Sequence, residues 1–514
     1  MIAKIFSMSV NGLQSDLIEV EVDINQGLPS FTIVGLPDQG VQESKERLRS
    51  ALKSSGTSLP TNRITVNLAP AHIRKSGPSF DLAIAIGILK NQGIISDTYL
   101  QDSLFLGELS LDGQLRRVSS VLPVTITAQE RGFKRIFVPR ANAIEASIIP
   151  GIDVVAIESL AEMITLLNQK QDISPLPLLD FGEYTRKNRK EENPFDFCHI
   201  VGQGHAKRAL EIAAAGGHNI LMDGPPGSGK TMLAKAFASI LPDMTIQEAI
   251  EVSKIYSISG LLDEKRPLIS ERPFRSVHHT ASGVSIIGGG RNATPGEISL
   301  AHKGVLFFDE ILEFQSSVLE VLRQPLEDGN ITVNRVNASY TYPARFTLVA
   351  AMNPCPCGYL TDPDRECICS SKQVEQYRGR LSGPLMDRID ISIEVPKVKT
   401  EELGISKKRE KTESSADIQV RVQQARNIQH KRFQNTSLTS NSEMTSKDIH
   451  QFCQLDTESD TILKQAVGNL NLSTRAYYRI IKLARTIADL GKSETILSEH
   501  ILEAMSLRKR EENI

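Results

Sequence analysis

The segment at residues 224–231 constrains the fold of this 514-residue chain more than any other. It fits the pattern G-x-x-x-x-G-K-[ST] at every position, between an apolar strand pattern (219–222) and a helix pattern (232–241). Glycines let backbone amides approach phosphate oxygens, and the start of the helix adds partial positive charge. A chance match in an ordinary loop would not explain this order of strand, loop and helix. The segment therefore predicts an α/β domain that binds ATP.

Two side chains of this phosphate-binding loop receive separate roles. Lys230 is expected to reach the β- and γ-phosphates of ATP, and the Thr231 hydroxyl is expected to bind Mg²⁺. The complete predicted loop consists of Gly224, Pro225, Pro226, Gly227, Ser228, Gly229, Lys230 and Thr231.

A second pattern supplies the acidic groups that ATP hydrolysis needs. Residues 305–308 are four consecutive apolar residues, and Asp309 and Glu310 follow them directly. A buried parallel strand delivers such residues to the edge of the sheet where ligands bind. We expect Asp309 to hold Mg²⁺ and Glu310 to activate the attacking water. The alternative is an ordinary strand end before a helix cap, which the nearby phosphate loop makes less favourable.

The length of the chain predicts roughly three domains at about 150 residues each. A proline-containing and then charged stretch without an apolar period indicates a linker; Glu191 and Glu192 argue against a DNA-contacting basic patch there. The expected parts are an N-terminal α/β domain (1–168), the linker (169–194), an ATPase core with a parallel sheet (195–400) and a helical C-terminal lid (401–514).

Charge and hydrophobicity exclude several classes of protein. Lys and Arg number 59 against 61 Asp and Glu, so the chain is neither a globally basic nucleic-acid coat nor an acidic tail protein. A local basic channel remains compatible with this balance. No stretch has the roughly 18 apolar residues of a membrane span, and the N-terminus lacks the plan of a signal peptide. We therefore expect a cytoplasmic protein without a membrane partner.

The acidic pair, together with Asn353 after a second apolar strand pattern (346–352), resembles the AAA+ ATPases. This resemblance implies that Asn353 orients the attacking water. Residues 384–390 resemble the segment that carries the arginine finger in the magnesium-chelatase branch, which makes Arg388 the candidate finger. Arg475, at the start of a helix pattern, resembles the second sensor arginine of the lid. For both arginines, an ordinary solvated position at a helix end is the alternative.

Further motifs resemble one family along essentially the whole chain. They lie at residues 274–282 with their His278-His279 pair, 288–290, 295–302 and 353–358. Together they resemble the ComM/YifB family of magnesium-chelatase-like AAA+ proteins. The resemblance implies a DNA motor that forms a hexameric ring and promotes branch migration when transforming DNA recombines with the chromosome.

A predicted hairpin carries the expected DNA contacts. The stretch between the phosphate loop and Asp309 is too long for a bare βα unit and must hold an insertion. Residues 331–335 and 340–342 flank a polar turn and predict a β-hairpin. In related ring motors such a hairpin faces the central pore, so Arg335 and Arg291 are expected to contact DNA phosphates. Ordinary solvated loop charges are the alternative.

The N-terminal domain resembles the Lon protease domain without its catalytic pair. Residues 75–79 resemble the serine segment of that domain, and residues 107–115 resemble the segment that leads to its lysine. Ser79 stands at the nucleophile's position, whereas Leu122 stands where the lysine is expected. A serine needs a base to become a nucleophile, and leucine cannot supply one. The neighbouring Arg116 and Arg117 stay protonated. We predict a Lon-like fold without proteolysis.

Four of the six cysteines form a candidate metal site. Cys355, Cys357, Cys367 and Cys369 make two C-x-C pairs separated by nine residues. Four thiolates in so short a segment suit tetrahedral Zn²⁺, which would brace the strand ending at Asn353. Free thiols and a disulfide pair remain the alternatives.

Three other functions compete with the DNA motor. A magnesium-chelatase motor subunit lacks a Lon-like N-terminal domain, and an ATP-dependent protease is opposed by Leu122. An AAA+ remodelling ATPase without helicase activity fits the motifs as well. Stimulation of ATP hydrolysis by DNA would separate the first function from the others.

Overall fold

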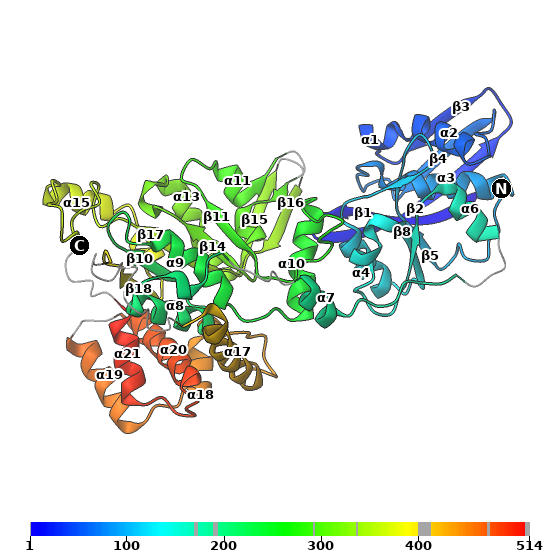
Figure 1. The fold of residues 1–514 in the computed structure, drawn as a ribbon. Coiled ribbons are helices and arrows are strands. Elements are labelled where there is room, and N and C mark those ends of the chain that lie inside the picture. The colour runs from blue at the N-terminus through cyan, green and yellow to red at the C-terminus, as the bar shows by residue number, and fades with distance from the viewer. Residues whose placement is uncertain are drawn as a thin grey trace. The chain divides into compact units, whose positions relative to one another are not determined.

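The fold is that of a computed structural model, which describes residues 2–168, 173–188, 194–290, 293–335, 338–398, 413–469 and 473–508. The chain divides into two units (Figure 1). The first unit contains residues 1–189 and 246–270, and the second contains residues 190–245 and 271–514.

A seven-stranded sheet is the framework of the first unit. β1 and β2 pair antiparallel along the whole of β1, whereas β5, β8 and β9 pair parallel to one another. Ile18, Val20 and Val22 are buried while charged residues alternate with them, as a strand with one covered face requires. The strand order is β3 (Ser30–Val34), β4 (Arg63–Ala69), β2 (Gln14–Asn25), β1 (Ala3–Asn11), β5 (Ser103–Phe105), β8 (Arg135–Pro139) and β9 (Asp153–Ile157).

Helix α3 (Asp81–Asn91) lies inside the first unit. Residues 81–89 are all buried, because this helix is apolar on nearly every face. Its one charged core group, Asp81, accepts a hydrogen bond at 2.6 Å from the Arg47 guanidinium. The other short elements are α1 (Gln39–Gln42), α2 (Ser44–Ser54), β6 (Glu108–Leu109), β7 (Leu115–Arg116), α4 (Val121–Glu130), α5 (Ala143–Ala146) and α6 (Leu160–Asn168).

The predicted linker at 169–194 is wrong for its middle part, which forms helix α7 (Phe181–Asn188). Phe181 and Tyr184 pack against the core cluster of the first unit, and the Tyr184 hydroxyl donates to the Leu268 carbonyl at 3.2 Å. These two aromatic residues, three positions apart, hold the helix against the first unit, although no residue of the helix is fully buried. Residues 169–172 and 189–193 lie outside the described part of the chain.

Residues 246–270 belong to the first unit, although the sequence placed them within the ATPase core. They include α10 (Ile246–Ile258), which packs against α4. Ile250 joins the hydrophobic cluster around α4, and the Ser120 amide donates to the Ser257 carbonyl at 3.3 Å. The insertion that the sequence predicted therefore contributes a helix to the other unit.

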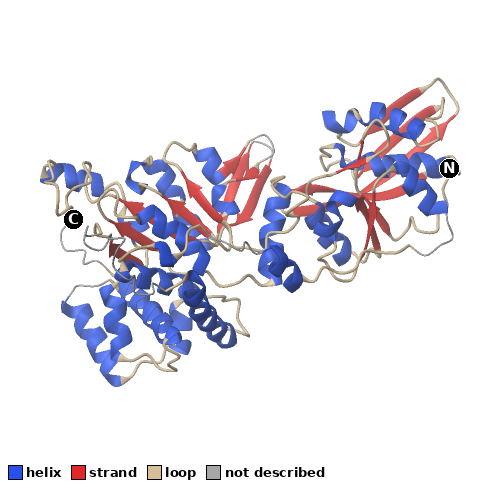
Figure 2. Cartoon of the chain, viewed as in Figure 1, coloured by secondary structure: helices blue, strands red, loops and turns tan. Residues whose placement is uncertain are grey.

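Five parallel strands form the sheet of the second unit, and their carboxyl ends meet at one edge (Figure 2). The order is β11 (Phe274–Val277), β14 (Val305–Phe308), β17 (Thr347–Met352), β10 (Ile220–Asp223) and β18 (Ile391–Glu394). The helices of this part are α8 (Gly204–Gly216), α9 (Lys230–Phe237), α11 (Gly283–Ile287), α12 (Glu297–Leu300), α13 (Ser316–Val321), α14 (Arg323–Asp328), α15 (Ser371–Arg378) and α16 (Gly383–Met386). Two hairpins complete it, β12 (Gly288–Gly289) with β13 (Thr294–Pro295), and β15 (Asn330–Arg335) with β16 (Ala338–Pro343).

The C-terminal part is helical, as predicted. One hydrophobic cluster joins Ile220 and Ile391 of the sheet to Leu483 and Ile487 of the lid. The helices are α17 (Ser415–Arg432), α18 (Ser446–Phe452), α19 (Thr457–Asn469), α20 (Thr474–Leu490) and α21 (Ser498–Ser506). The predicted α/β class is therefore confirmed, whereas the Lon-like character of the first unit stays a prediction. Of the helices described, none has the length and apolar character needed to cross a bilayer.

Candidate nucleotide site

The phosphate-binding loop lies between the carboxyl end of β10 and the first turn of α9. A Cβ atom on Gly224 would lie 2.2 Å from the Val395 carbonyl oxygen, so only glycine fits beside the end of β18. Gly227 and Gly229 have φ angles of +79° and +93°, which side chains rarely tolerate. A steric or conformational constraint therefore requires each of the three glycines. With them, the loop can turn its backbone amides toward a phosphate group.

Lys230 is folded onto this loop. Its Nζ donates to the carbonyls of Gly224 at 2.6 Å and Pro225 at 2.9 Å, and it lies 3.4 Å from Asn353 Oδ1. Burial lowers the pKa of the Lys230 ammonium, since desolvation disfavours its charge. A phosphate group would reverse that effect by supplying the opposite charge.

The residues predicted to hold magnesium are in contact. The Thr231 hydroxyl donates to Asp309 Oδ2 at 2.8 Å, across 78 positions of sequence. Hydroxyl and carboxylate oxygens are the ligands that Mg²⁺ prefers. The Ser228 hydroxyl is buried and, among the described residues, has no hydrogen-bond partner. The donor set therefore fits a nucleotide with Mg²⁺.

Glu310 has a left-handed backbone conformation, with φ of +51°. Its amide donates to Asp309 Oδ1 at 3.1 Å, and its side chain is exposed. Left-handed backbone is unfavourable for a residue with a side chain and is concentrated at functional sites. The conformation turns Glu310 away from the line of β14, immediately beyond the magnesium candidate Asp309.

Asn353 reaches the loop because of strand register. β10 pairs parallel with β17, and Asp223 lies opposite Met352. The residues that follow these two, Gly224 and Asn353, therefore leave the sheet side by side. The contact between Asn353 and Lys230 follows from that register.

The four cysteines converge as the sequence predicted. Their sulfurs all lie within 4.8 Å of one another, and those of Cys355, Cys357 and Cys367 are 3.3, 3.6 and 3.6 Å apart. Tetrahedral Zn²⁺ with Zn–S bonds of about 2.3 Å places its sulfurs about 3.8 Å apart. Backbone amides, chiefly that of Tyr359, lower the pKa of Cys357 to about 6, which favours a thiolate ligand. The cluster Cys355, Cys357, Cys367 and Cys369 fits a zinc ion.

This cysteine loop packs against the phosphate loop. Gly358 has φ of +85°, and a Cβ atom there would lie 2.9 Å from Pro226 Cδ. Arg378 Nε donates to the Pro354 carbonyl at 3.1 Å, and Arg378 Nη2 lies 3.7 Å from Asp223 Oδ2. The metal candidate and the nucleotide candidate are therefore neighbours.

Sequence reasoning missed two positioning residues at this site. Arg378 connects the cysteine loop with the end of β10, as just described. The Gln203 side-chain amide donates to the carbonyl oxygens of Pro396 at 2.6 Å and Ser228 at 3.3 Å. It therefore links the phosphate loop to the segment that follows β18. Arg378 lies in an Arg-Gly-Arg triplet and Gln203 in a Val-Gly-Gln triplet. Neither triplet is part of a known nucleotide-binding motif, so the sequence did not connect them with the phosphate loop.

Arg388 lies at the opposite edge of the sheet from the phosphate loop. β18 runs parallel to β10 with Ile391 opposite Ile220, and Arg388 precedes β18 whereas the loop follows β10. Four strand residues span about 13 Å. The Arg388 guanidinium forms an ion pair with Glu327 and donates to the Pro384 carbonyl at 2.6 Å.

Arg475 lies beside Arg388. Its Nη1 is 3.0 Å from Oδ2 of Asp387, the residue before Arg388. The two arginines to which the family resemblance gives a role in ATP hydrolysis therefore lie together, away from the phosphate loop of their own chain.

His278 and His279 lie at the carboxyl edge of the sheet. β11 pairs parallel with β14, and Val277 lies opposite Phe308, so the histidines leave the sheet next to Asp309 and Glu310. Their ring centroids are 4.2 Å apart. The sequence singled out this pair as a family motif without a role, and the topology places it at the nucleotide edge.

The predicted hairpin is present as β15 and β16, which pair antiparallel. The backbone of Arg335 pairs with Ala338, but the side chain of Arg335 lies outside the described part of the structure, as does the whole of Arg291. The proposed DNA contacts of both residues stay predictions.

In the first unit, Ser79 lines a cavity of about 250 Å³. Among the described lining residues there is no lysine or histidine, and Leu122 is buried in α4, where its amide donates to Glu145 at 3.1 Å. The cavity thus offers Ser79 neither of these bases.

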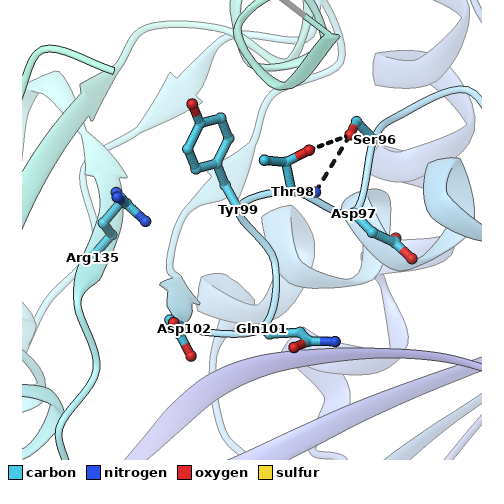
Figure 3. A pocket seen from close by; sticks show the side chains of 7 residues that line it. All are labelled: Ser96, Asp97, Thr98, Tyr99, Gln101, Asp102 and Arg135. Atoms are coloured by element: carbon cyan, nitrogen blue, oxygen red, sulfur yellow. Dashed lines mark hydrogen bonds between the residues drawn. The ribbon is translucent and has the colours of Figure 1, made fainter. Parts of the chain in front are cut away.

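A second cavity, of about 380 Å³, has a polar lining (Figure 3). Arg135 lies over the Tyr99 ring at 5.1 Å, and the acids Asp97 and Asp102 form ion pairs with neighbouring lysines. Since its charges are already compensated, this cavity adds no reactive group. Its lining consists of Ser96, Asp97, Thr98, Tyr99, Gln101, Asp102 and Arg135.

Comparison with protein families covers most of the chain. Residues 196–403 match the family described as magnesium chelatase, subunit ChlI. Residues 20–142 match subunit ChlI of Mg-chelatase, and residues 412–508 match the C-terminal part of magnesium chelatase subunit ChlI.

Individual proteins are similar over different lengths. The chain is 42% identical over 510 residues to the competence protein ComM of Haemophilus influenzae, covering 99% of this chain and 97% of that protein. It is 41% identical over 498 residues to YifB of Escherichia coli, covering 97% and 95%. It is 25% identical over 221 residues to the magnesium-chelatase 38 kDa subunit of Cereibacter sphaeroides, covering 40% and 59%.

Proposed function

The chain belongs to the ComM/YifB family of magnesium-chelatase-like AAA+ proteins, and on this premise we propose that it is an ATP-driven DNA motor. Its task would be branch migration during recombination of transforming DNA. The observation that carries the proposal is the similarity, along nearly the whole chain, to a protein named for competence. The chelatase subunit, by contrast, is similar over 40% of this chain.

ATP hydrolysis is assigned to the residues at the carboxyl edge of the sheet. The amides of the phosphate loop and Lys230 would bind the phosphates, so Lys230 would exchange loop carbonyls for phosphate oxygens. Mg²⁺, when bound, neutralises charge on the β- and γ-phosphates. Thr231 and Asp309 would hold it.

Glu310 would accept a proton from the attacking water, and Asn353 would orient that water. The 3.4 Å contact between Asn353 and Lys230 supports this assignment, because it puts the Asn353 amide beside the group that would bind the γ-phosphate.

A neighbouring copy of the chain would complete the site. Arg388 and Arg475 lie at the edge of the sheet opposite their own phosphate loop. An arginine there can serve a nucleotide only in the next subunit, which supports the hexameric ring that the family suggests. Arg388 would stabilise the transition-state charge as the finger, with Arg475 beside it.

The DNA path is assigned to the β15–β16 hairpin and its insertion, with Arg335 and Arg291 as phosphate contacts. We place the activity in the cytoplasm, where chromosomal DNA would be its substrate. We also propose that the four cysteines hold a structural Zn²⁺, since their sulfurs have the spacing of a tetrahedral site.

Strand exchange on a synthetic four-way junction tests the function. The wild-type protein should resolve the junction with ATP, whereas Glu310→Gln should bind ATP and DNA but lose about 10²–10⁴-fold in hydrolysis and in branch migration. Glu46→Gln, which replaces an exposed acid of α2 in the first unit, serves as the control for a lost carboxylate.

If wild-type protein hydrolyses ATP but leaves the junction intact, branch migration is refuted. The remaining candidate is then an AAA+ remodelling ATPase without helicase activity.

A further inference from the structure

The cavity beside Ser79 carries polar groups that the proposed motor does not use. It lies in the first unit, where the end of β1, the turn before α3 and the start of α4 converge. Serines 9, 76, 79, 119 and 120 line it together with Arg117 and Glu108. Cavities with a few converging polar groups are the usual places for small ligands.

Arg117 supplies a positive charge to the wall of this cavity. Its side chain is 23% exposed, and its Nη2 lies 3.5 Å from Glu145 Oε2. Its other terminal nitrogen, Nη1, is buried and finds no hydrogen-bond partner in the described part of the chain. An arginine cannot release its proton, so this donor capacity persists at every physiological pH. Such an incompletely paired guanidinium needs an acceptor to satisfy it.

Glu145 holds this guanidinium in place. The carboxylate is buried and accepts hydrogen bonds from the Leu122 amide at 3.1 Å, the Ser257 hydroxyl at 2.5 Å and the Asn142 amide at 3.2 Å. With both oxygens engaged, Glu145 fixes one side of Arg117, which is also one of the residues that line the cavity. Because Glu145 already holds the Arg117 side chain, the guanidinium loses little conformational entropy when a ligand binds to it.

The charges around the cavity favour a ligand with no more than one negative charge, because each acid there already has an arginine partner. Glu108, the other charged residue of the lining, lies 3.7 Å from Arg116, so its charge is already compensated. Arg117 is likewise paired, with Glu145 at 3.5 Å, so one added anionic group would share its guanidinium with Glu145, and the serine hydroxyls can donate to the oxygens of that group. A doubly charged phosphate would leave excess negative charge beside Glu108.

We propose that this cavity binds a carboxylate group through Arg117 and the serine hydroxyls. The group would belong either to the end of a peptide chain or to a small organic acid, which share this chemistry. Ser79 would then contribute a hydrogen bond and not a nucleophile. The proposal is independent of the motor activity and of DNA binding.

Methyl NMR of the full chain provides the test. Met8 lines the cavity and is buried, so its ¹³C-methyl resonance, assigned with Met8→Leu, reports on occupancy. The probes are N-acetyl-Ala-Ala with a free carboxylate, the same peptide as its C-terminal amide, and acetate. We expect the peptide acid or acetate to shift the Met8 signal saturably and the amide to leave it unchanged. Saturation by acetate at the peptide's affinity identifies a small acid, and a response to the peptide alone identifies a chain end.

Variants decide whether Arg117 is responsible. Arg117→Gln should weaken binding about tenfold to a hundredfold, the effect of losing a charge-assisted hydrogen bond. Arg131→Gln removes the same charge at the far end of α4 and should bind normally. Unchanged binding by Arg117→Gln, an equal response to the amide, or no response to either acid overturns the proposal.

A second variant covers the case in which Arg117→Gln does not fold. Ser119 is exposed at the cavity and can be replaced by tryptophan without loss of a core contact. Ser119→Trp should abolish the Met8 response by occupying the cavity. Binding that survives this change would contradict the assigned location.

Discussion

At the residue scale, the nucleotide site depends on individual residues whose backbone conformation or lack of a Cβ atom allows close packing. The sequence motif includes all three glycines of the loop, but only the structure explains Gly224, which lies against the carbonyl of Val395, the residue after β18. For Glu310 and Arg378, too, the sequence did not predict the feature that the structure shows. No sequence pattern predicted the left-handed backbone of Glu310, and Arg378 contacts Pro354 and Asp223, which are remote from it in sequence.

Gly224→Ala should impair nucleotide binding. A Cβ atom 2.2 Å from the Val395 oxygen forces the loop or β18 to move, and the amides then lose their alignment. We expect ATP affinity to fall at least about tenfold, since one displaced charge-assisted contact has that effect. Titration with a fluorescent ATP analogue measures it.

Gly204→Ala is the matched control, because a Cβ atom there meets nothing within 4 Å and the position starts α8. It should bind ATP as the wild type does. Equal affinity of Gly224→Ala and Gly204→Ala would contradict the steric argument.

At the element scale, the cysteine loop connects a metal candidate to the phosphate loop. The sequence predicted the four ligands from their spacing, and the structure brings their sulfurs within 4.8 Å. It could not predict that Gly358 of this loop would contact Pro226. That contact depends on the parallel register of β10 and β17, which places the two segments side by side.

Cys355→Ser should lower zinc content and weaken ATP binding together. Cys355 is the buried member of the cluster, and its loss leaves an incomplete site beside Pro226. Metal analysis of chelator-free protein and ATP titration check the two effects. Cys198→Ser, a cysteine outside the cluster, should change neither. Protein that is free of zinc yet binds ATP normally would refute the metal's bracing role.

At the scale of the whole molecule, the chain is divided into two units, and the proposed hydrolysis would need a second copy of the chain. Residues 246–270 follow α9 in the chain but belong to the first unit, so an insertion within the second unit supplies a helix to the first. Arg388 and Arg475 lie at the far edge of the sheet, beyond reach of their own phosphate loop. Hydrolysis would therefore be a property of an assembly.

Mixing two inactive variants tests this dependence. Arg388→Ala should lose about 10³–10⁵-fold in ATP hydrolysis, and Glu310→Gln should also be inactive. In a mixture, a Glu310→Gln subunit would lend its Arg388 to the intact site of an Arg388→Ala neighbour, so activity should partly return. The double variant mixed with Glu310→Gln is the control and should stay inactive. A mixture without recovery would indicate that Arg388 acts within its own chain or only structurally.

The sequence by itself determined the chemistry that depends on local spacing: the phosphate loop, the acidic pair after β14, the four thiol ligands, the helices of the lid and the hairpin. Each of these is encoded within a few consecutive residues by backbone conformation and side-chain periodicity. Only the tertiary structure decided where the distant parts meet. The register of the parallel strands places Asn353 beside Lys230 and places Arg388 at the opposite edge of the sheet from the phosphate loop. Hydrophobic packing makes α7 and α10 part of the first unit. Such contacts join residues tens to hundreds of positions apart. The free energy of burial that stabilises them depends on the whole folded chain, so no short sequence pattern reveals them.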